Sequence, residues 1–517
     1  MLSSKKELFF VSVIITISSL CSFYTGNFFH LRDSVNPIKD IKIVRSENML
    51  GSVPSRLNEK DFIFTSGYCY NIGSGFNHSD FYHGNISQIN TSTYWRFPIS
   101  EISALQYLKS TPKGWISNLF IPYKLNLPII SILVHPEDFF SYSNGIYVRG
   151  FDADFVSSIV NYPTPWTQPA NYYRKEDDKR NVFFSYYNTK GEALYSSYAY
   201  AEISGKATRS FPQKSIRLSA SKSLGNKNFK YDFFGNGDGL KSLVLRNGGN
   251  DNTKSLFRDM LMQELVKKTG ILTSGFVPSE VFINGEYWGI HFLQNRVDEN
   301  FIAESFGCKE KEVTIVENWK LDSGDESEFL NLIRVKDNLT KLNYAELLAV
   351  FDMDDLTTYL VGQLFFANSD WPANNLKMYK ISNSKKSATK WRFAFFDLDF
   401  GFAYTGENAV SEDMFARLFD GKDEFSKLFR KLMESSDFHK LLREKFRKMI
   451  SEDLSRENLK NKISSLENEI SPAIQRHTER WRKPATVEEW NREVDILKAF
   501  ATNRENEMNL LIKKYLK

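Results

Sequence analysis

The 517-residue sequence has few cysteines, a small net charge and none of the common hydrolase motifs. Its three cysteines, Cys21, Cys69 and Cys308, form no CxxC pair, which excludes a zinc ribbon and a thioredoxin-type motif. The net charge is only +4 and no run of Lys and Arg stands out, so we expect no nucleic-acid partner. The seven histidines show no HExxH spacing and no GxSxG motif is present, which removes zinc proteases and serine hydrolases of those types.

The N-terminus combines two basic residues with a long uncharged stretch. Lys5 and Lys6 precede Leu8–Tyr24, which contains no charged residue. This stretch is near the lower limit of about 17 residues for a bilayer-spanning helix, and basic residues before it orient the rest of the chain outward. We therefore expect residues 1–30 to anchor the protein in a membrane, with the main domain extracytoplasmic, in the periplasm or at the cell surface. A cleaved signal peptide with a secreted product is the alternative.

After the N-terminus, the sequence divides into regions that differ in composition and in hydrophobic periodicity. Residues 31–126 predict a polar stalk, up to about residue 60, and then a small β-rich module with many aromatic and turn-forming residues. Residues 127–298 carry strand patterns, whereas most of residues 299–517 carry helical periodicity. This order predicts an α+β chain with two lobes, the first rich in β-strands and the second helical. Cys69 and Cys308 pair only if folding brings their Cα atoms close together, which the sequence does not show.

Short patterns predict individual elements within these regions. Residues 182–205 predict two strands around an Asn-Thr-Lys-Gly turn, and residues 279–298 predict a hairpin with Asn284-Gly285 at its turn. Residues 255–270 have apolar side chains at helical spacing, followed by two Lys and a Gly as stop signals. In the helical half, “LKMYKIS” and “WRFAFFD” predict a single hairpin.

Two short polar islands lie among residues that we expect to be buried. “NSDWPANN” contains Asp370 and Asn375, and “FFDLDFG” contains Asp397 and Asp399. Unpaired acids in apolar surroundings are costly, so the chain needs a reason to keep them. In phosphoryl transfer a loop Asp accepts the proton of the substrate hydroxyl, while an Asn five residues later and a carboxylate at a strand end hold Mg²⁺. The order of the two islands predicts such a site, although each alone also fits an acid that caps a backbone turn.

A phosphate-binding site also needs cations. The strand “FPQKSIRLSA” offers Lys214 and Arg217, which lie on opposite faces of a regular strand, so only one of them faces a cleft. A carboxylate of the helix over residues 255–270 is expected to orient that cation, and Asp259 and Glu264 are the candidates. The stretch “NGGND” at 247–251 reads as a turn before this helix, with a phosphate contact as the alternative.

Taken together, these stretches resemble the CotH kinase family, named after spore coat protein H. The matching stretches are “GKATRSFPQKSIRLSA”, “LVLRNGGNDNTKSLFRDMLMQEL”, “VFINGEYWGIHFLQNRVDENFI”, “NSDWPANNLKMYK” and “WRFAFFDLDFGFA”. They occur in the order of the family, and the resemblance covers roughly residue 127 to the C-terminus.

The resemblance implies an atypical protein kinase that uses ATP with Mg or Mn and phosphorylates Ser or Thr of exported proteins. By motif, Asp370 matches the catalytic Asp, and Asn375, Asp397 and Asp399 match the residues on the metal side. Lys214 and Arg217 match the basic pair expected near the phosphates of the nucleotide.

The chain departs from the family pattern at Gln294-Asn295, where many members carry an acid. Two other functions stay open beside the active kinase. One is a catalytically inactive kinase fold used as a surface or coat scaffold. The other is an enzyme that transfers AMP from ATP with the same side chains.

Overall fold

The computed structural model describes residues 126–134, 136–157, 169–174, 178–235, 237, 239–382 and 390–517, together with the backbone of five short strands between residues 40 and 121. Residues 1–30, where we expect the anchor, and the side chain of Cys69 lie outside this part of the chain. None of the helices described combines the length and apolar character needed to cross a membrane. The anchor and the Cys69–Cys308 pair therefore stay predictions.

The five N-terminal strands form one sheet, with neighbours in the order β1-β5-β4-β2-β3. Their bounds are Asp40–Arg45 (β1), Phe62–Thr65 (β2), Tyr68–Asn71 (β3), Leu105–Thr111 (β4) and Gly114–Ile121 (β5). β1 runs parallel to β5, and the other neighbours are antiparallel. Residues 40–45, which we expected in a polar stalk, are thus a strand. Their alternating pattern “DIKIVR” is too short to stand out from its polar flanks.

Seven strands close into a barrel with the neighbour order β10-β12-β11-β6-β7-β8-β9, and β9 pairs with β10 to complete the ring. The strands are β6 (Ile129–Val134), β7 (Arg180–Tyr187), β8 (Ala193–Ser204), β9 (Ser215–Ser219), β10 (Ser242–Arg246), β11 (Phe276–Ile283) and β12 (Glu286–Asn295). The hairpins β7–β8 and β11–β12 are the two that the sequence predicts. Closure of the sheet was not predicted.

The alternation of β9 decides which barrel side chains reach a ligand. Ile216 and Leu218 are fully buried in an apolar cluster with the aliphatic and aromatic side chains of the other barrel strands. Ser215 and Arg217 project to the opposite face, because successive residues of a strand point to opposite sides. Residues of β8, β9, β10 and β12 line a cleft, and most of them are polar.

The second half contains a four-stranded sheet, of which the sequence predicted only one hairpin. Its order is β14-β13-β15-β16, with β13 (Val313–Glu317), β14 (Lys320–Ser323), β15 (Lys377–Ile381) and β16 (Arg392–Ala394). β15 and β16 are the predicted hairpin, and residues 383–389 between them lie outside the description. β13 and β14 form the hairpin that was missed.

The described chain also contains α-helices, most of them in its second half. Their bounds are Pro136–Phe140 (α2), Gly150–Ser157 (α3), Arg258–Val266 (α4), Glu299–Phe306 (α5), Glu326–Asp337 (α6), Tyr344–Val350 (α7), Met353–Phe366 (α8), Met414–Asp420 (α9), Glu424–Leu432 (α10), Ser436–Ser451 (α11), Arg456–Trp481 (α12) and Val487–Tyr515 (α13). α8 is buried along almost its whole length and carries the core of the helical lobe.

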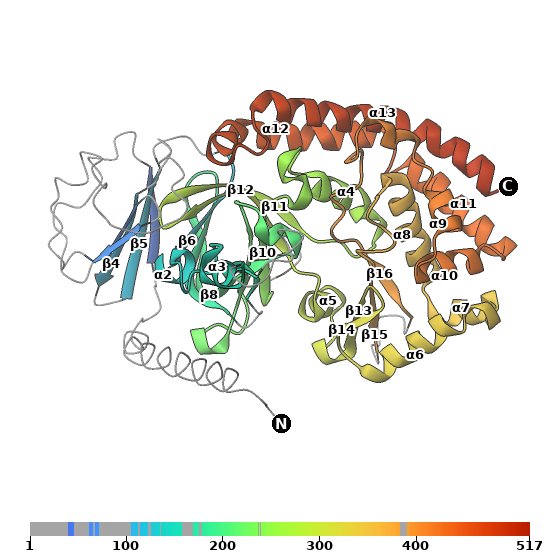
Figure 1. Cartoon of the computed structure of the whole chain (residues 1–517), viewed down its shortest axis with the longest axis horizontal. Coiled ribbons are helices and arrows are strands. Elements are labelled where there is room, and N and C mark those ends of the chain that lie inside the picture. The colour runs from blue at the N-terminus through green and yellow to red at the C-terminus, as the bar shows by residue number, and fades with distance from the viewer. Residues whose placement is uncertain are drawn as a thin grey trace, which may run out of the picture.

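The two C-terminal helices connect the barrel with the helical lobe. Figure 1 shows α12 and α13 as a long antiparallel pair that runs along one edge of the molecule, from beside β12 to beyond α9. At the barrel end, Trp481 of α12 donates its indole N–H to the backbone oxygen of Trp288 over 2.8 Å, and Arg480 pairs with Glu286. The fold is α+β, as predicted, and it is consistent with two lobes.

Candidate active site

One cleft of about 800 Å³ lies between the outer face of the barrel and the four-stranded sheet with its adjoining loops. From the barrel, β9 and β10 contribute Arg217 and Arg246. From the loops before β15 and after β16 come Asp370, Asn375 and Asp397. Four of the six residues that the sequence singled out therefore line one cleft. The other two, Lys214 and Asp399, are not among its lining residues.

Asp370 and Asn375 lie in the loop that joins α8 to β15. The Nδ2 group of Asn375 donates to Oδ2 of Asp370 over 2.8 Å and to the backbone oxygen of Asp397 over 3.2 Å. Asn374 donates a further hydrogen bond, of 2.9 Å, to Oδ1 of Asp370. Asn375 has a φ of 58°, a left-handed conformation that Asn tolerates better than most residues. Its side chain therefore ties the two polar islands together.

Asp397 and Asp399 share one guanidinium group. Nη2 of Arg246 donates to Oδ1 of Asp397 over 2.6 Å and to Oδ2 of Asp399 over 3.2 Å. The side chain of Asp397 is 36% exposed, whereas Asp399 is fully buried behind it. The backbone N–H of Asn250 donates to Oδ2 of Asp399 over 2.6 Å. Arg246 is thus a cation of the site that the sequence analysis did not name.

Asp259 of α4 orients this cation. Its Oδ2 lies 3.4 Å from Nε of Arg246, and its Oδ1 accepts from the backbone N–H of Leu398 over 2.9 Å. The other candidate, Glu264, pairs with Lys267 and Lys462 and is not among the residues that line the cleft. We expected this carboxylate to orient Lys214 or Arg217, but in the structure it lies beside Arg246 instead.

Burial and charge shift the pKa values of this cluster. Burial and the neighbouring charge of Asp397 raise the pKa of Asp399 well above its usual range, against the opposing effect of Arg246. Burial lowers the pKa of Arg246, but the carboxylates of Asp259, Asp397 and Asp399 outweigh it and raise that pKa above its ordinary value. Arg246 therefore stays charged, while burial and the nearby charge of Asp397 favour the protonated form of Asp399.

The two predicted phosphate-binding cations have different surroundings. Arg217 lines the cleft and pairs with Glu202, its cross-strand neighbour on β8. Lys214 precedes β9 and is buried, with Nζ donating to the backbone oxygens of Arg209 and Phe211 over 2.5 and 2.7 Å. Only one of the pair faces the cleft, as predicted, and it is Arg217.

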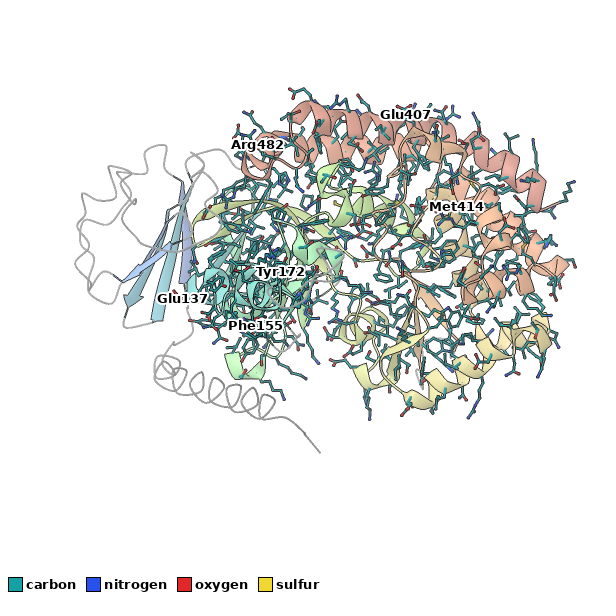
Figure 2. All side chains as sticks on the ribbon, viewed as in Figure 1. Glu137, Phe155, Tyr172, Glu407, Met414 and Arg482 are labelled. Atoms are coloured by element: carbon teal, nitrogen blue, oxygen red, sulfur yellow. The ribbon has the colours of Figure 1, made fainter. Side chains whose placement is uncertain are left out.

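The ammonium group of Lys214 is held inside the barrel half of the molecule. It lies 4.0 Å from the centroid of the Tyr172 ring, and Tyr172 lies beside the barrel strands in Figure 2, far from Met414 of the helical lobe. Burial lowers the pKa of Lys214 to about 7, while the carbonyl acceptors and the ring favour its charged form. A phosphate contact by Lys214 does not fit this position.

The backbone of the “NGGND” stretch lies close to the side chains of Asp399 and Arg246. Gly248 and Gly249 both have positive φ, 89° and 63°, and Gly249 begins a short 3-10 helix that leads toward α4. A Cβ atom on Gly249 would lie 2.1 Å from Oδ2 of Asp399 and 2.6 Å from Nη2 of Arg246. The turn that the sequence predicts is present, and glycine is needed at Gly249 so that the backbone can approach the acid pair.

The side chains fit a divalent cation with few protein ligands. Oδ1 of Asp399 is buried and has no hydrogen-bond partner among the described groups, and three carboxylates face only one guanidinium. Within the described ranges no three His, Cys, Asp or Glu side chains converge as a metal centre. Asp397, Asp399 and Asn375 would therefore supply only part of the coordination. That suits Mg²⁺, which typically binds one or two carboxylates together with substrate phosphates.

The departure from the family pattern also lies in the cleft. Gln294 and Asn295, at the end of β12, line it, as does the following Arg296. Oε1 of Gln294 and Nδ2 of Asn295 are buried without a hydrogen-bond partner in the described structure. Amides thus form this part of the cleft wall, and they add no negative charge to it.

Residues 201–508 match the protein-family model described as CotH kinase protein. This span is more than half of the chain, and every cleft residue named above falls within it. No curated protein sequence matches the chain.

Proposed function

The chain belongs to the CotH kinase family, and from that premise we propose that it transfers the γ-phosphate of ATP to Ser or Thr of exported proteins. The observation that carries the proposal is the convergence of Asp370, Asn375 and Asp397 on one cleft, joined through the Asn375 amide. A cleft of about 800 Å³ is within the usual size range of ligand pockets, roughly 300–1,000 Å³.

Each side chain has a role that its position supports. Asp370 accepts the proton of the acceptor hydroxyl, and its two amide donors, Asn374 and Asn375, fix the direction of its carboxylate. Arg217 and Arg246 project from the barrel face into the cleft, where they would contact the phosphates.

The proposed cofactors are ATP and Mg²⁺ or Mn²⁺. Asp397, Asp399 and Asn375 would hold the ion, which supplies neutralisation of the charge on the phosphate oxygens. The protein groups position the phosphates against Asp370, so the chemistry depends on their common cleft.

Labelled ATP tests the proposal directly. The purified chain with Mg²⁺ or Mn²⁺ should label itself or casein, and Asp370→Ala should lower the rate at least about 100-fold, the usual contribution of a general base. Asp354→Asn, at an exposed carboxylate of α8 paired with Lys445, is the matched control and should leave the rate unchanged. No label, with Asp370→Ala equal to the wild type, contradicts a kinase activity.

One observation favours an inactive scaffold as the second candidate. Arg246 already compensates part of the charge of Asp397 and Asp399 in the absence of a metal ion, so these acids are compatible with a purely structural role. A scaffold predicts no change in thermal unfolding when ATP and metal are added.

The other alternative is an enzyme that transfers AMP. Mass spectrometry of the labelled acceptor separates it from a kinase, since the acceptor carries either an adenylyl group or a phosphate.

We also propose that residues 1–30 anchor the chain with its main domain outside the cytoplasm, where exported proteins would be its acceptors. The uncharged stretch after Lys5 and Lys6 supports this proposal. Full-length protein should sediment with membranes and be accessible to protease added from outside. Soluble protein in the cytoplasmic fraction contradicts it.

A further inference from the structure

The position of Arg246 has a consequence for what the acid pair binds. Its guanidinium contacts the side chains of three aspartates, Asp259 from α4 and Asp397 and Asp399 from the loop after β16. Nη2 lies 2.6 Å from Oδ1 of Asp397, so a metal ion on that carboxylate would sit directly beside a fixed positive charge. An incoming ligand therefore meets a site that is neither purely acidic nor purely basic.

The cation is held so that it stays near the acid pair. Only 16% of the Arg246 side chain is exposed, and Asp259 holds its Nε from one side at 3.4 Å. On another side the backbone of Gly249 comes so close that a Cβ there would lie 2.6 Å from Nη2. The positive charge is thus a permanent part of the site.

Two ligands respond in opposite ways to this charge. A bare divalent ion is attracted by the carboxylates but repelled by the guanidinium beside them. The complex of the same ion with a nucleoside triphosphate carries a net negative charge, and its phosphates are acceptors for a guanidinium donor. The charge of Arg246 therefore weakens binding of the first ligand and strengthens binding of the second.

We infer that Arg246 makes the cleft selective for the metal–nucleotide complex over the free metal ion. This inference rests on the proposed function, because it takes the cleft as a site for nucleotide and metal. Metal and nucleotide then bind cooperatively, and by linkage each raises the affinity for the other by the same factor. The selectivity keeps the acid pair from filling with free divalent cations when no nucleotide is present.

Titration calorimetry on the full chain tests the inference with two ligands. Arg246→Gln should bind Mn²⁺ alone about tenfold more tightly than the wild type, and a non-hydrolysable ATP analogue in saturating Mn²⁺ about tenfold more weakly, each about 1.4 kcal/mol. A change of opposite sign for the two ligands is not expected from a merely structural defect. The matched control is Arg392→Gln. Arg392 lies on β16, is 23% exposed and pairs with Asp352 and Asp355, outside the residues that line the cleft.

A charge-preserving variant keeps the test decisive if Arg246→Gln does not fold. Arg246→Lys retains the charge, so its affinity for Mn²⁺ alone should stay within about threefold of the wild type. A Lys variant that binds Mn²⁺ tenfold more tightly overturns the inference, as does Arg246→Gln with unchanged or weaker Mn²⁺ binding. If the wild type binds the analogue with Mn²⁺ while Arg246 variants change neither affinity, only the inference fails. If the wild type binds neither Mn²⁺ nor the analogue, both the inference and the proposed function fail.

Discussion

At the scale of single residues, the acid pair persists in apolar surroundings because a cation reaches it from elsewhere in the chain. Arg246 precedes Asp397 and Asp399 by 151 and 153 residues. Two unit charges 4 Å apart interact by about 4 kcal/mol at an effective dielectric constant of 20, which offsets much of the cost of burying a carboxylate. A divalent ion would therefore add to a charge balance that Arg246 already provides in part.

The sequence identified the acids and missed their partner for a physical reason. Asp370, Asn375, Asp397 and Asp399 stand out because polar residues interrupt apolar stretches. Arg246 ends a strand and precedes a turn, where charged residues are common and need no explanation. Its role follows only from the barrel, which places the end of β10 against the loop after β16. The motif “LVLRNGGND” was visible, but nothing local assigned its arginine to the cleft.

The close approach of Gly249 gives the first prediction at this scale. Gly249→Ala should destabilise the fold by about 3 kcal/mol and abolish nucleotide binding, because the new Cβ overlaps Asp399 and Arg246 and the φ is positive. Urea unfolding and a nucleotide titration measure the two effects.

The control for Gly249→Ala shares its backbone strain. Gly270 also has a positive φ, of 83°, but a Cβ added there would have no heavy atom within 4 Å. Gly270→Ala is therefore the control. It should cost only about 1 kcal/mol, the penalty for a left-handed non-glycine residue. Equal effects of the two substitutions show that the approach to the acid pair is unimportant.

Lys214 and Arg217 give a second prediction, since they share a motif but not an environment. Arg217→Gln should weaken binding of the nucleotide with Mn²⁺ about tenfold, because it removes a cleft cation. Lys214→Gln should mainly lower the free energy of unfolding, because Lys214 satisfies two backbone oxygens and stacks on Tyr172. Nucleotide titration and urea unfolding of both variants check the contrast. A larger loss of nucleotide affinity from Lys214→Gln reverses the assignment.

At the scale of elements, strong local patterns gave correct predictions. The β11–β12 hairpin was predicted from Asn284-Gly285, and both residues have positive φ in the structure. The helix over residues 255–270 is shorter than predicted, since α4 begins only at Arg258, after Leu256 with a φ of 75°. β13 and β14 were missed because the strands, of five and four residues, are joined by a tight turn and surrounded by helical patterns.

The attachment of α12 to β12 leads to a prediction on pH. His477 of α12 accepts a hydrogen bond from the backbone N–H of Ile290 over 3.0 Å, and its other ring nitrogen lies 2.9 Å from the oxygen of Lys483. Burial lowers the pKa of His477 to about 3, and burial lowers that of its neighbour His291 to about 4. Because the unfolded chain binds this proton near pH 6.5, stability is lost as the pH falls below that value.

A substitution isolates the contribution of His477 from that of the other titrating groups. Between pH 7 and pH 5 the wild type should lose about 2 kcal/mol through His477, a loss that His477→Gln avoids because Gln does not titrate. The variant should be less stable at pH 7 but depend less on pH. Urea unfolding at the two pH values measures the difference. Equal losses in both proteins contradict a buried neutral His477.

At the scale of the whole molecule, the arrangement of the lobes depends on contacts that no local sequence pattern predicts. The barrel closes because β9 pairs with β10 and β6 pairs in parallel with β11, across 151 residues. Figure 1 shows α12 and α13 side by side along the edge of the molecule. At the barrel end, His477, Arg480 and Trp481 of α12 contact residues of β12. The α+β class and the order of strand-rich and helical halves were predicted from periodicity. The closed barrel and the second sheet depend on pairings between distant segments.

The cleft between these parts gives a prediction that separates an enzyme from a scaffold. A ligand that binds only the folded chain at 100 times its Kd should raise the free energy of unfolding by roughly 2.7 kcal/mol. With Mn²⁺ and a non-hydrolysable ATP analogue, we expect the midpoint of thermal unfolding to rise. Asp397→Asn should remove this rise, because it takes away the cleft-facing carboxylate that would share the metal with the phosphates.

The result is decisive because the two functions use the same acids differently. In a scaffold, Asp397 serves only as a partner of Arg246, so Asp397→Asn lowers the melting temperature and the ligands change nothing in either protein. In a kinase, the ligand-induced rise is present in the wild type and absent in the variant. Asp354→Asn, remote from the cleft, should keep the full rise and shows that a lost carboxylate alone does not abolish it. A flat thermal scan of the wild type with saturating metal and analogue therefore leaves only the scaffold.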